Sequence, residues 1–507
     1  MGTSNMELPW RRLYLFADAV DAPGLHFPGL QIPSGFQAVA VVPAPDELAR
    51  LQIPGTGPAT RFFFAGATPR EPVRVQTLRI TFASNIKGEV EVEAFLPESK
   101  RRIGLFDVRY AYSKQMFEIA VDPGMVDGIY REGIGLRLTK GTEAVWILWG
   151  EGKDCSVFAP HLLVLPETED FTSKNRLALF NHHLKSQVCY HRSGWMEGCV
   201  LDGLYDLYRQ TEDITYLHAV KNHLQQFLAD NSGSEEHSGP RVQNGKIVAD
   251  VTERTLPYAV LARIEPDHPA IGALIEHWYA DKREDGSVYD RETDTITGEG
   301  VYTAGYPMAA IAAALDRDDL AELALRQLLS RKERLAAEAG IYLRADVQGQ
   351  RTYLNWARAW AWYLLGAARI LIELKDWSLK SPNLYYEEAA KEFVRAAVIA
   401  ASMQQEDGLW AVFTDDPVTG AEAGGSAGIA AALALGVRYG FLEEAFRSKA
   451  ETAWDGLLLH LTPDGLLGGV SQTNQGGEEL QRSGYRVLFQ MGMGLMAQLG
   501  AALGKSL

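Results

Sequence analysis

"TGEGVYTAGYPM", residues 297–308, joins a glycine-rich loop to the beginning of a predicted helix. One carboxylate, Glu299, lies between Gly298 and Gly300, and an aromatic side chain, Tyr302, follows it closely. Small and apolar residues then continue to about residue 316 with the spacing of a buried helix. Loops of this kind recur before later helices of the chain, and their recurrence predicts the fold.

From Thr172 onward, apolar residues follow the helical period, and the pattern predicts twelve helices. No fixed repeat length separates them, which argues against a regular solenoid. Long, glycine-rich connections precede the even-numbered helices from the fourth onward, whereas the connections after most of them are short. This alternation predicts an (α/α)6 barrel, in which six inner helices alternate with six outer ones and the long loops gather at one end. The approximate helical ranges are 173–190, 195–210, 213–229, 254–264, 268–280, 301–316, 318–335, 354–374, 384–404, 424–440, 442–461 and 481–503.

The first part of the chain predicts strands instead. "VRVQTLRITF" (73–82) and "EVEVEAFL" (89–96) alternate with period two, and "EAVWILWG" (143–150) is a denser apolar run. Clusters of proline and glycine separate these segments, which favours a β-sandwich. We therefore predict an α+β multidomain protein, with a β-sandwich accessory domain over residues 1–168 and a catalytic barrel over residues 169–507.

The amino-acid composition restricts the kinds of molecule that the protein could bind. The 507 residues carry a net charge of −16, which argues against nucleic acid because that partner needs a basic surface. The chain has 11 Trp and 20 Tyr, side chains that pack cores and also stack on the apolar faces of sugars. Three cysteines, Cys155, Cys189 and Cys199, form neither a disulfide framework nor a metal-ligand spacing. We expect no metal and no cofactor.

Targeting signals are not apparent in the sequence. The first residues, "MGTSNMELPWRR", contain no apolar stretch of the kind found in signal peptides, so we expect a cytoplasmic protein. Since no apolar run reaches about 18 residues, we expect no membrane span. The sequence leaves the oligomeric state open, and a homo-oligomer is one of the states that it allows.

Polar residues gather at the N-terminal ends of the predicted inner helices, which places them at the mouth of the barrel. "ADVTERTLPYA" (249–259) contributes Asp250 and Glu253 before the fourth helix, and Glu299 precedes the sixth. Each of these acids also fits the simpler role of a helix cap or first-turn carboxylate. Because converging helix N-termini favour a bound anion, a sugar acid suits this mouth better than a neutral sugar.

Two segments resemble a known group of enzymes. "NWARAWAW" is similar to the signature W-x-R-G-x-G-W, with Trp356, Arg358 and Trp362 in matching places. The segment "DGLWAVFTDDPVTGAEAGGSAG" resembles the pattern G-L-W…D-P…E-x-S-A-S, with Glu422 and Ser426 in matching places. On these motifs, residues 175–500 or so resemble glycoside hydrolase families 88 and 105, the unsaturated glucuronyl and rhamnogalacturonyl hydrolases. The resemblance does not extend to the β-rich part.

The sequence also departs from the family pattern. Glu299 falls at the place of the family's general acid, an aspartate, and Asp250 and Glu253 compete for the place of a second aspartate. Two glycines of the arginine motif are alanines here, and Arg344 stands where the family often has a histidine. The longer acid and the additional arginine make a related (α/α)6-barrel β-glucuronidase, acting on saturated glucuronic acid, the principal alternative.

The resemblance implies an exo-acting glycoside hydrolase that releases a terminal unsaturated uronic acid from oligosaccharides. One carboxylic acid and one carboxylate would carry the reaction, and arginine would hold the carboxylate of the sugar. A sugar epimerase, a polysaccharide lyase on the same barrel and a carbohydrate-binding protein without chemistry are more distant alternatives. The expected catalytic residues are Glu299, Glu253 and Asp250, and the expected substrate-binding residues are Arg358, Trp356, Trp362, Arg344, Tyr302, Glu422 and Ser426.

Overall fold

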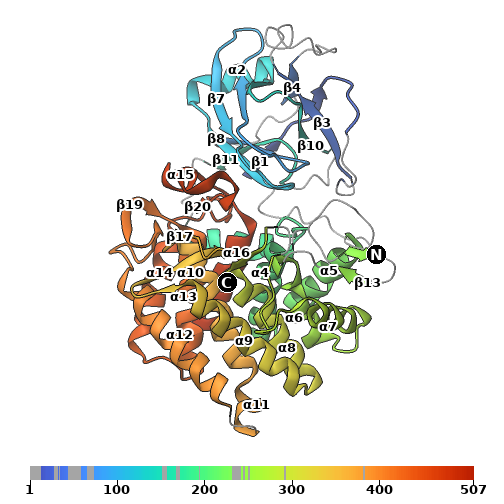
Figure 1. Cartoon of the computed structure of the whole chain (residues 1–507). Helices are drawn as coiled ribbons and strands as arrows, with labels where there is room; N and C mark the ends of the chain where they lie inside the picture. Colours follow the sequence, from blue (N-terminus) through green and yellow to red (C-terminus); the bar gives the residue numbers. More distant parts are fainter. Residues whose placement is uncertain are drawn as a thin grey trace, which may run out of the picture. The chain divides into compact units, whose positions relative to one another are not determined.

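The chain contains both helices and strands and divides into two compact units (Figure 1). Unit 1 comprises Met1–Leu179 together with Gln472–Gly477, and unit 2 comprises Phe180–Ser471 and Glu478–Leu507. Our computed structural model describes residues 13–27, 32, 35–43, 59–64, 73–150, 157–166, 172–192, 194–230, 241–243, 246–248, 252–290, 293–380 and 383–507.

Unit 1 is rich in strands. Its described strands form a five-stranded sheet in the order β2-β4-β9-β6-β7, a four-stranded sheet in the order β1-β11-β5-β8, and the pair β10-β3. Pairing within each is antiparallel. The strands are β1 (Tyr14–Phe16), β2 (Ala19–Asp21), β3 (Gln37–Val41), β4 (Thr60–Phe63), β5 (Val73–Thr81), β6 (Glu91–Phe95), β7 (Arg102–Asp107), β8 (Met116–Ala120), β9 (Ile134–Lys140), β10 (Val145–Trp149) and β11 (His161–Pro166), with helices η2 (Pro123–Met125) and α2 (Val126–Glu132) before β9.

The two strands predicted from alternation are confirmed as β5 and β6, and the strand predicted from the denser apolar run is confirmed as β10. Burial does not alternate along β5 or β6, since the last four residues of each strand are all buried. All of β10 is buried, which explains its denser apolar run. The β-rich character of this part is therefore confirmed at the level of its sheets. That the sheets form a sandwich, and that the unit is an accessory domain, remain predictions.

Unit 2 is built from helices, and short strands lie in several of the connections between them. No helix in the described ranges combines the length and apolar character that crossing a membrane requires. The helices are α3 (Ser173–Leu184, which begins in unit 1), α4 (Gly194–Thr211), α5 (Ile214–Asp230), η3 (Thr252–Thr255), α6 (Pro257–Ile264), α7 (Pro269–Asp281), η4 (Val301–Gly305), α8 (Tyr306–Leu315), α9 (Asp318–Leu335), α10 (Ala357–Glu373), α11 (Lys375–Lys380), α12 (Leu384–Ser402), α13 (Ala423–Arg438), α14 (Ala445–Leu458), α15 (Gly477–Arg482) and α16 (Gln490–Leu503). The short strands are β12 (Arg241–Gln243), β13 (Lys246–Val248), β14 (Thr295–Thr297), β15 (Ala336–Ala337), β16 (Gly340–Asp346), β17 (Arg351–Leu354), β18 (Ala411–Phe413), β19 (Asp416–Ala421), β20 (Val470–Ser471) and β21 (Arg486–Val487).

Six helices close into a ring. Following the chain, α4 contacts α6, α6 contacts α8, α8 contacts α10, α10 contacts α13, α13 contacts α16, and α16 returns to α4. Helices α5, α9, α12 and α14 pack outside members of this ring. Unit 2 is therefore a helical barrel whose inner helices are the even-numbered helices of the sequence prediction.

Each of the twelve predicted helices corresponds to a helix of the structure, but several begin later than predicted: α6 and α14 begin three residues later, at Pro257 and Ala445, and two further cases have a visible cause. The last was predicted from residue 481, yet α16 begins at Gln490, because the chain first makes α15, a left-handed turn at Gly484 and strand β21. The eighth was predicted from residue 354, yet α10 begins at Ala357, because Tyr353 and Asn355 adopt positive φ angles that a helix cannot continue.

The ring closes where α4 and α16 touch through their backbones. A Cβ atom on Gly494 would lie 2.5 Å from the carbonyl carbon and oxygen of Cys199, and one on Gly203 would lie 2.6 Å from the carbonyl oxygen of Gly494. No side chain fits in either space. Glycine at both positions therefore sets the distance between the first and last inner helices.

We expect Gly494→Ala to lower the free energy of unfolding by about 1–3 kcal/mol, because the added methyl group must push two helices apart. Gly272→Ala is the matched control, since Gly272 lies in the outer helix α7 with nothing within 4 Å of a Cβ atom. That change should be neutral or stabilising by about 0.5–1 kcal/mol. Urea unfolding of both variants measures the difference, and equal stability would contradict this account of ring closure.

Candidate active site

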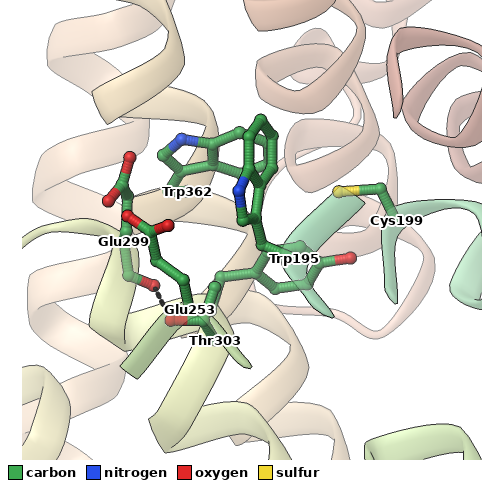
Figure 2. Close-up of a pocket in the computed structure, with 7 residues that line it drawn as sticks. Trp195, Cys199, Glu253, Glu299, Thr303 and Trp362 are labelled. Atoms are coloured by element: carbon green, nitrogen blue, oxygen red, sulfur yellow. Dashed lines mark hydrogen bonds between the residues drawn. The ribbon is translucent and has the colours of Figure 1, made fainter. Parts of the chain in front are cut away.

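A small pocket lies at the N-terminal ends of several inner helices (Figure 2). The space among its lining atoms, open solvent included, is about 190 Å³. Four of its residues are buried and form its floor, whereas Trp195, Glu253 and Glu299 are partly exposed and form its rim. The residues that line it are Trp195, Cys199, Glu253, Glu299, Tyr302, Thr303 and Trp362.

The loop that carries Glu299 is held by a buried arginine. Arg331, on α9, donates from Nε to the carbonyl oxygen of Thr297 at 2.8 Å and from Nη2 to that of Val288 at 2.8 Å. Its guanidinium occupies the space beside Gly300, where a Cβ atom would lie 2.1 Å from Nη2. Glycine after Glu299 is therefore required by the arginine that fixes the loop, and the next residues can enter the helix directly.

The helix after Glu299 opens with a π-helical turn, η4. Pro307 lacks an N–H group, so it cannot donate to the carbonyl oxygen of Thr303, its usual partner four residues earlier. The Thr255 hydroxyl donates to that oxygen instead. The Thr303 hydroxyl in turn donates to the carbonyl oxygen of Glu299 at 3.1 Å. The wider turn thus connects the backbone of Glu299 to the segment that carries Glu253.

Glu253 reaches the pocket because η3 packs closely on the start of α4. A Cβ atom on Gly194 would lie 2.6 Å from the backbone of Arg254, and one on Gly198 would lie 2.3 Å from Leu256 Cγ. These two glycines let the backbone of η3 approach α4. Figure 2 shows the resulting arrangement, with the Glu253 and Glu299 carboxyl groups facing each other below Trp362.

The pKa of the Glu253 carboxyl group is raised by its surroundings. Burial raises the pKa of Glu253 well above its usual range, and the charge and side-chain hydrogen bond of Glu299 and the charge of Asp290 raise it further, while Arg344 partly offsets this. Glu299 Oε2 is buried and meets no donor at ordinary distance in the described part of the chain. The raised pKa favours the protonated form of Glu253. That Glu299 is the general acid, as the sequence analysis expected, stays a prediction.

Aromatic rings form one wall. The rings of Trp195 and Trp362 meet edge to face at 5.7 Å, and Tyr302 stacks on Trp362 at 5.9 Å with 6° between the planes. Flat rings beside a carboxyl pair suit a sugar, because its axial C–H groups pack on an aromatic face while its hydroxyl groups meet polar atoms.

The two predicted arginines lie in different surroundings, and neither lines the pocket. Arg358 is 1% exposed, lies over the ring of Trp356 at 4.4 Å and donates to the carbonyl oxygen of Ser471 at 3.0 Å. Arg344 is partly exposed on β16, opposite Thr297, and is close enough to affect the pKa of Glu253. Arg344 Nε is buried without a hydrogen-bond partner among the described residues. Of the two, Arg344 is the more accessible from the carboxyl pair.

Glu422 and Ser426 make contacts within the protein. Glu422 caps α13 through the Gly425 N–H group and accepts from the Ser471 N–H group at 2.8 Å. The Ser426 hydroxyl accepts from the Trp410 N–H group at 2.8 Å. Both side chains hold loops together, in keeping with the helix-cap interpretation, and their predicted contact with substrate remains a prediction.

The structure thus brings together Glu253, Glu299, Tyr302 and Trp362 of the predicted site. It leaves Arg344, Arg358, Trp356, Glu422 and Ser426 outside the pocket lining, and Asp250 lies outside the described residues. No group of three or more His, Cys, Asp or Glu side chains in the described part could hold a metal ion.

Three lining residues were not predicted: Trp195, Cys199 and Thr303. Trp195 lies in "SGWMEG", at the start of an inner helix, so the rule that selected Glu299 could have selected it too. Nothing in the sequence distinguishes Thr303 or Cys199 from core residues. Burial, with Asp202 nearby, raises the pKa of the Cys199 thiol well above its usual range, so this cysteine is an uncharged part of the floor.

Comparison with known proteins agrees with this geometry. The sequence model of Glycosyl Hydrolase Family 88 matches residues 172–498, well over half of the chain. The chain belongs to glycosyl hydrolase family 88. It is therefore a glycoside hydrolase, and the match lies almost wholly in unit 2. The β-rich part lies outside the matched residues.

Solved structures of similar proteins share the fold of this family 88 protein. A possible member of family GH105 from Salmonella enterica is 19% identical, with a TM-score of 0.54 over 68% of this chain and 96% of the other. One from Klebsiella pneumoniae is 19% identical, with a TM-score of 0.55 over 67% and 96%. A family 88 hydrolase from Bacteroides vulgatus is 19% identical, with a TM-score of 0.50 over 66% and 99%.

The protonated state of Glu253 predicts a pH-dependent stability. In the unfolded chain Glu253 ionises near pH 4.3, whereas the folded protein keeps its proton to a higher pH. Its stabilising contribution is therefore present below about pH 4 and is lost as the pH rises through the folded pKa. Glu253→Gln stays neutral, so we expect its free energy of unfolding, relative to wild type, to increase between about pH 4 and 8, measured by urea unfolding.

Asp319→Asn is the control with opposite sign. A hydrogen bond from Arg317 is the main cause that holds the pKa of Asp319 low, so its stabilisation is complete above about pH 4. That variant should stay less stable than wild type, by an amount that does not change over the same range. A constant difference for Glu253→Gln as well would contradict the protonated carboxyl.

Proposed function

We propose that this protein is an exo-acting hydrolase that releases a terminal uronic acid from oligosaccharides, with an unsaturated uronyl residue as its preferred substrate. The observation that carries the proposal is the pair Glu253–Glu299 in one pocket, where burial and the neighbouring carboxylate raise the pKa of Glu253. Such a pair supplies an acid and a base in one pocket. A small pocket with a closed floor at the barrel mouth suits the end of a sugar chain better than its middle.

The chemistry follows from the two protonation states. In an unsaturated uronyl residue the Glu253 carboxyl donates its proton to C4 of the C4=C5 double bond, while Glu299 takes a proton from water and the water oxygen bonds to C5. The hemiketal formed at C5 opens to a ketone, which leaves a hemiacetal at C1. That hemiacetal breaks down and releases the alcohol of the remaining sugar. The net reaction consumes one water, and the pair regains its proton from Glu299.

The carboxylate of the uronic acid needs a cation. Arg344 supports this role best, because it is partly exposed, lies near Glu253 and has a buried Nε without a partner in the described part. A guanidinium can hold a carboxylate through two parallel hydrogen bonds. Arg358, buried between Trp356 and Ser471, would support the pocket wall and add positive charge at longer range.

A β-glucuronidase acting on saturated glucuronic acid is the second candidate. What favours it is the length of Glu299, which stands where the resembling families have an aspartate, and Arg344, which stands where a histidine is common; Glu253 competes with Asp250 for the place of the second aspartate. A longer side chain brings its carboxyl group further into the pocket. The same pair could then protonate a glycosidic oxygen and assist attack at C1.

Two substrates assayed side by side test the function. The wild-type protein should consume an unsaturated uronyl disaccharide, followed by loss of its enol-acid absorbance, faster than it releases nitrophenol from p-nitrophenyl β-glucuronide. Glu253→Gln and Glu299→Gln should each lower kcat by about 10²–10⁴-fold, because an amide neither donates nor accepts the proton. Preference for the glucuronide would favour the second candidate, and inactivity on both would refute the proposal.

Arginine variants test how the acid is recognised. Arg344→Met should lower kcat/KM for the uronide by about one to two powers of ten, with a much smaller effect on the matching neutral glucoside. Arg344→Lys should recover only part, since it keeps the charge and loses the planar fork. Arg358→Met should lower kcat/KM for the uronide and for the glucoside to a similar extent. If Arg358→Met instead lowers kcat/KM for the uronide selectively and Arg344→Met does not, the buried Arg358 is the residue that binds the carboxylate of the sugar.

A further inference from the structure

A buried aspartate lies beneath the pocket floor. Asp202, on α4, accepts a hydrogen bond from the Tyr302 hydroxyl at 2.5 Å and another from the Tyr306 hydroxyl at 2.6 Å. Two arginines approach it, Arg263 Nη1 at 3.7 Å and Arg369 Nε at 4.0 Å. The carboxylate is therefore fixed by four groups from three other inner helices, and neither the sequence motifs nor the proposed chemistry uses it.

Tyr302 is the one tyrosine of this network that lines the pocket. Its ring is stacked between Trp362, at 5.9 Å, and Tyr306, at 5.6 Å with 3° between the planes. Its hydroxyl donates to Asp202 and accepts from Gln498 Nε2 at 3.1 Å. Because the hydroxyl is fully engaged below the floor, Tyr302 offers a substrate its ring and no hydrogen bond.

A short, closely packed backbone segment links Tyr302 to Glu299, so the position of one affects the position of the other. Two residues, Gly300 and Val301, separate the two along the backbone, and the π-helical turn η4 begins between them. The turn lies against α10, where a Cβ atom on Gly366 would be 2.5 Å from the Tyr302 backbone nitrogen. A change in the depth of Tyr302 would therefore move the turn, and with it the Glu299 carboxyl.

We propose that Asp202 is a positioning residue for catalysis: by holding the Tyr302 hydroxyl it fixes the turn that directs Glu299 toward Glu253. This inference rests on the proposed function, in which those two carboxyl groups carry the reaction. Asp202 touches neither carboxyl group. It acts through Tyr302, and its effect is on the distance and angle between the acid and the base.

The test compares three substitutions, each of which alters a buried hydroxyl or carboxyl group. Tyr302→Phe removes the hydroxyl and keeps the stacked ring, and Asp202→Asn keeps the shape and removes the charge. Tyr363→Phe is the matched control: Tyr363 is also buried on α10 and donates to a buried carboxylate, Glu392 Oε1, at 2.8 Å, but it does not line the pocket. Circular dichroism and thermal unfolding establish that each variant is folded before its kinetics are measured.

Tyr302→Phe and Asp202→Asn should lower kcat on the unsaturated disaccharide by about 10–100-fold, as expected for a displaced catalytic group, with KM changed less than about threefold. The groups that act on Glu253 are Glu299, Asp290 and Arg344. If Glu299 moves away, its upward influence on the pKa of Glu253 falls, so the basic limb of the pH–rate profile should shift to lower pH. Tyr363→Phe should keep the wild-type rate and profile.

Two results would overturn the inference. One is a Tyr302→Phe variant with wild-type kcat and pH profile. The other is an equal loss in Tyr302→Phe and Tyr363→Phe with unshifted profiles, which would make Asp202 a core-stabilising residue. If Asp202→Asn does not fold, Tyr302→Phe alone decides.

A measurement without substrate separates this inference from the proposed function. The infrared carbonyl band of protonated Glu253, assigned with Glu253→Gln, is titrated in wild type and in Tyr302→Phe. A lower titration pH in Tyr302→Phe supports positioning even if the wild type cleaves neither uronide, and an unchanged titration refutes it. Inactivity of the wild type counts against the proposed function alone.

Discussion

Backbone-to-backbone contact around α4 is the constraint on which the catalytic unit depends. Gly203 and Gly494 let α4 and α16 close the inner ring, and Gly194 and Gly198 let η3 approach the same helix from another side. The contact between α4 and α16 closes the barrel, and the contact between η3 and α4 places Glu253 at its mouth. Because both involve one helix, the geometry of the acid is tied to the closure of the fold. Side chains of any size at these four positions would separate layers that the rest of the core is built to fill.

The acid–base character of the pocket arises from burial and from the charge of neighbouring side chains. Burial keeps a proton on Glu253, the neighbouring Glu299 reinforces this, and no metal ligand set exists among the described residues. The glycine-rich loop before η4 is rigid at its base, because Arg331 holds its carbonyl groups, and Gly300 makes room for that arginine. A loop that reads in sequence as flexible is therefore a fixed support for one carboxylate. The two tryptophans then complete a site in which the reactive groups and the apolar wall come from different inner helices.

Much of this could be predicted from sequence, because helical period and loop length follow from local patterns. The twelve helices and the inner ring were predicted in this way, whereas the pairing of Glu299 with a second acid, Glu253 or Asp250, came from the family resemblance. Some site residues were not predicted, because their place in the site depends on which helices pack together. Trp195 and Cys199 are on one face of α4, and Asp202 is one turn further along. The π-helical turn also escaped, although Pro307 is its visible cause, since only the presence of the Thr255 hydroxyl makes the freed carbonyl group tolerable. Glu422 shows the converse: a family motif selected it, and its local chemistry is that of a helix cap.

The assignment of Gln472–Gly477 to unit 1 has a consequence for how the protein is made. Gln472 Nε2 donates to Gln115 Oε1 at 3.1 Å and to the carbonyl oxygen of Arg109 at 3.3 Å, so this loop belongs to the N-terminal unit by its bonds as well as by proximity. The ribosome delivers the strands of unit 1 first, but the loop emerges only after the chain up to Ser471 has been synthesised. The first unit to be translated therefore cannot complete its hydrogen bonds until most of the second has been made, and the two units are interleaved in sequence rather than joined end to end.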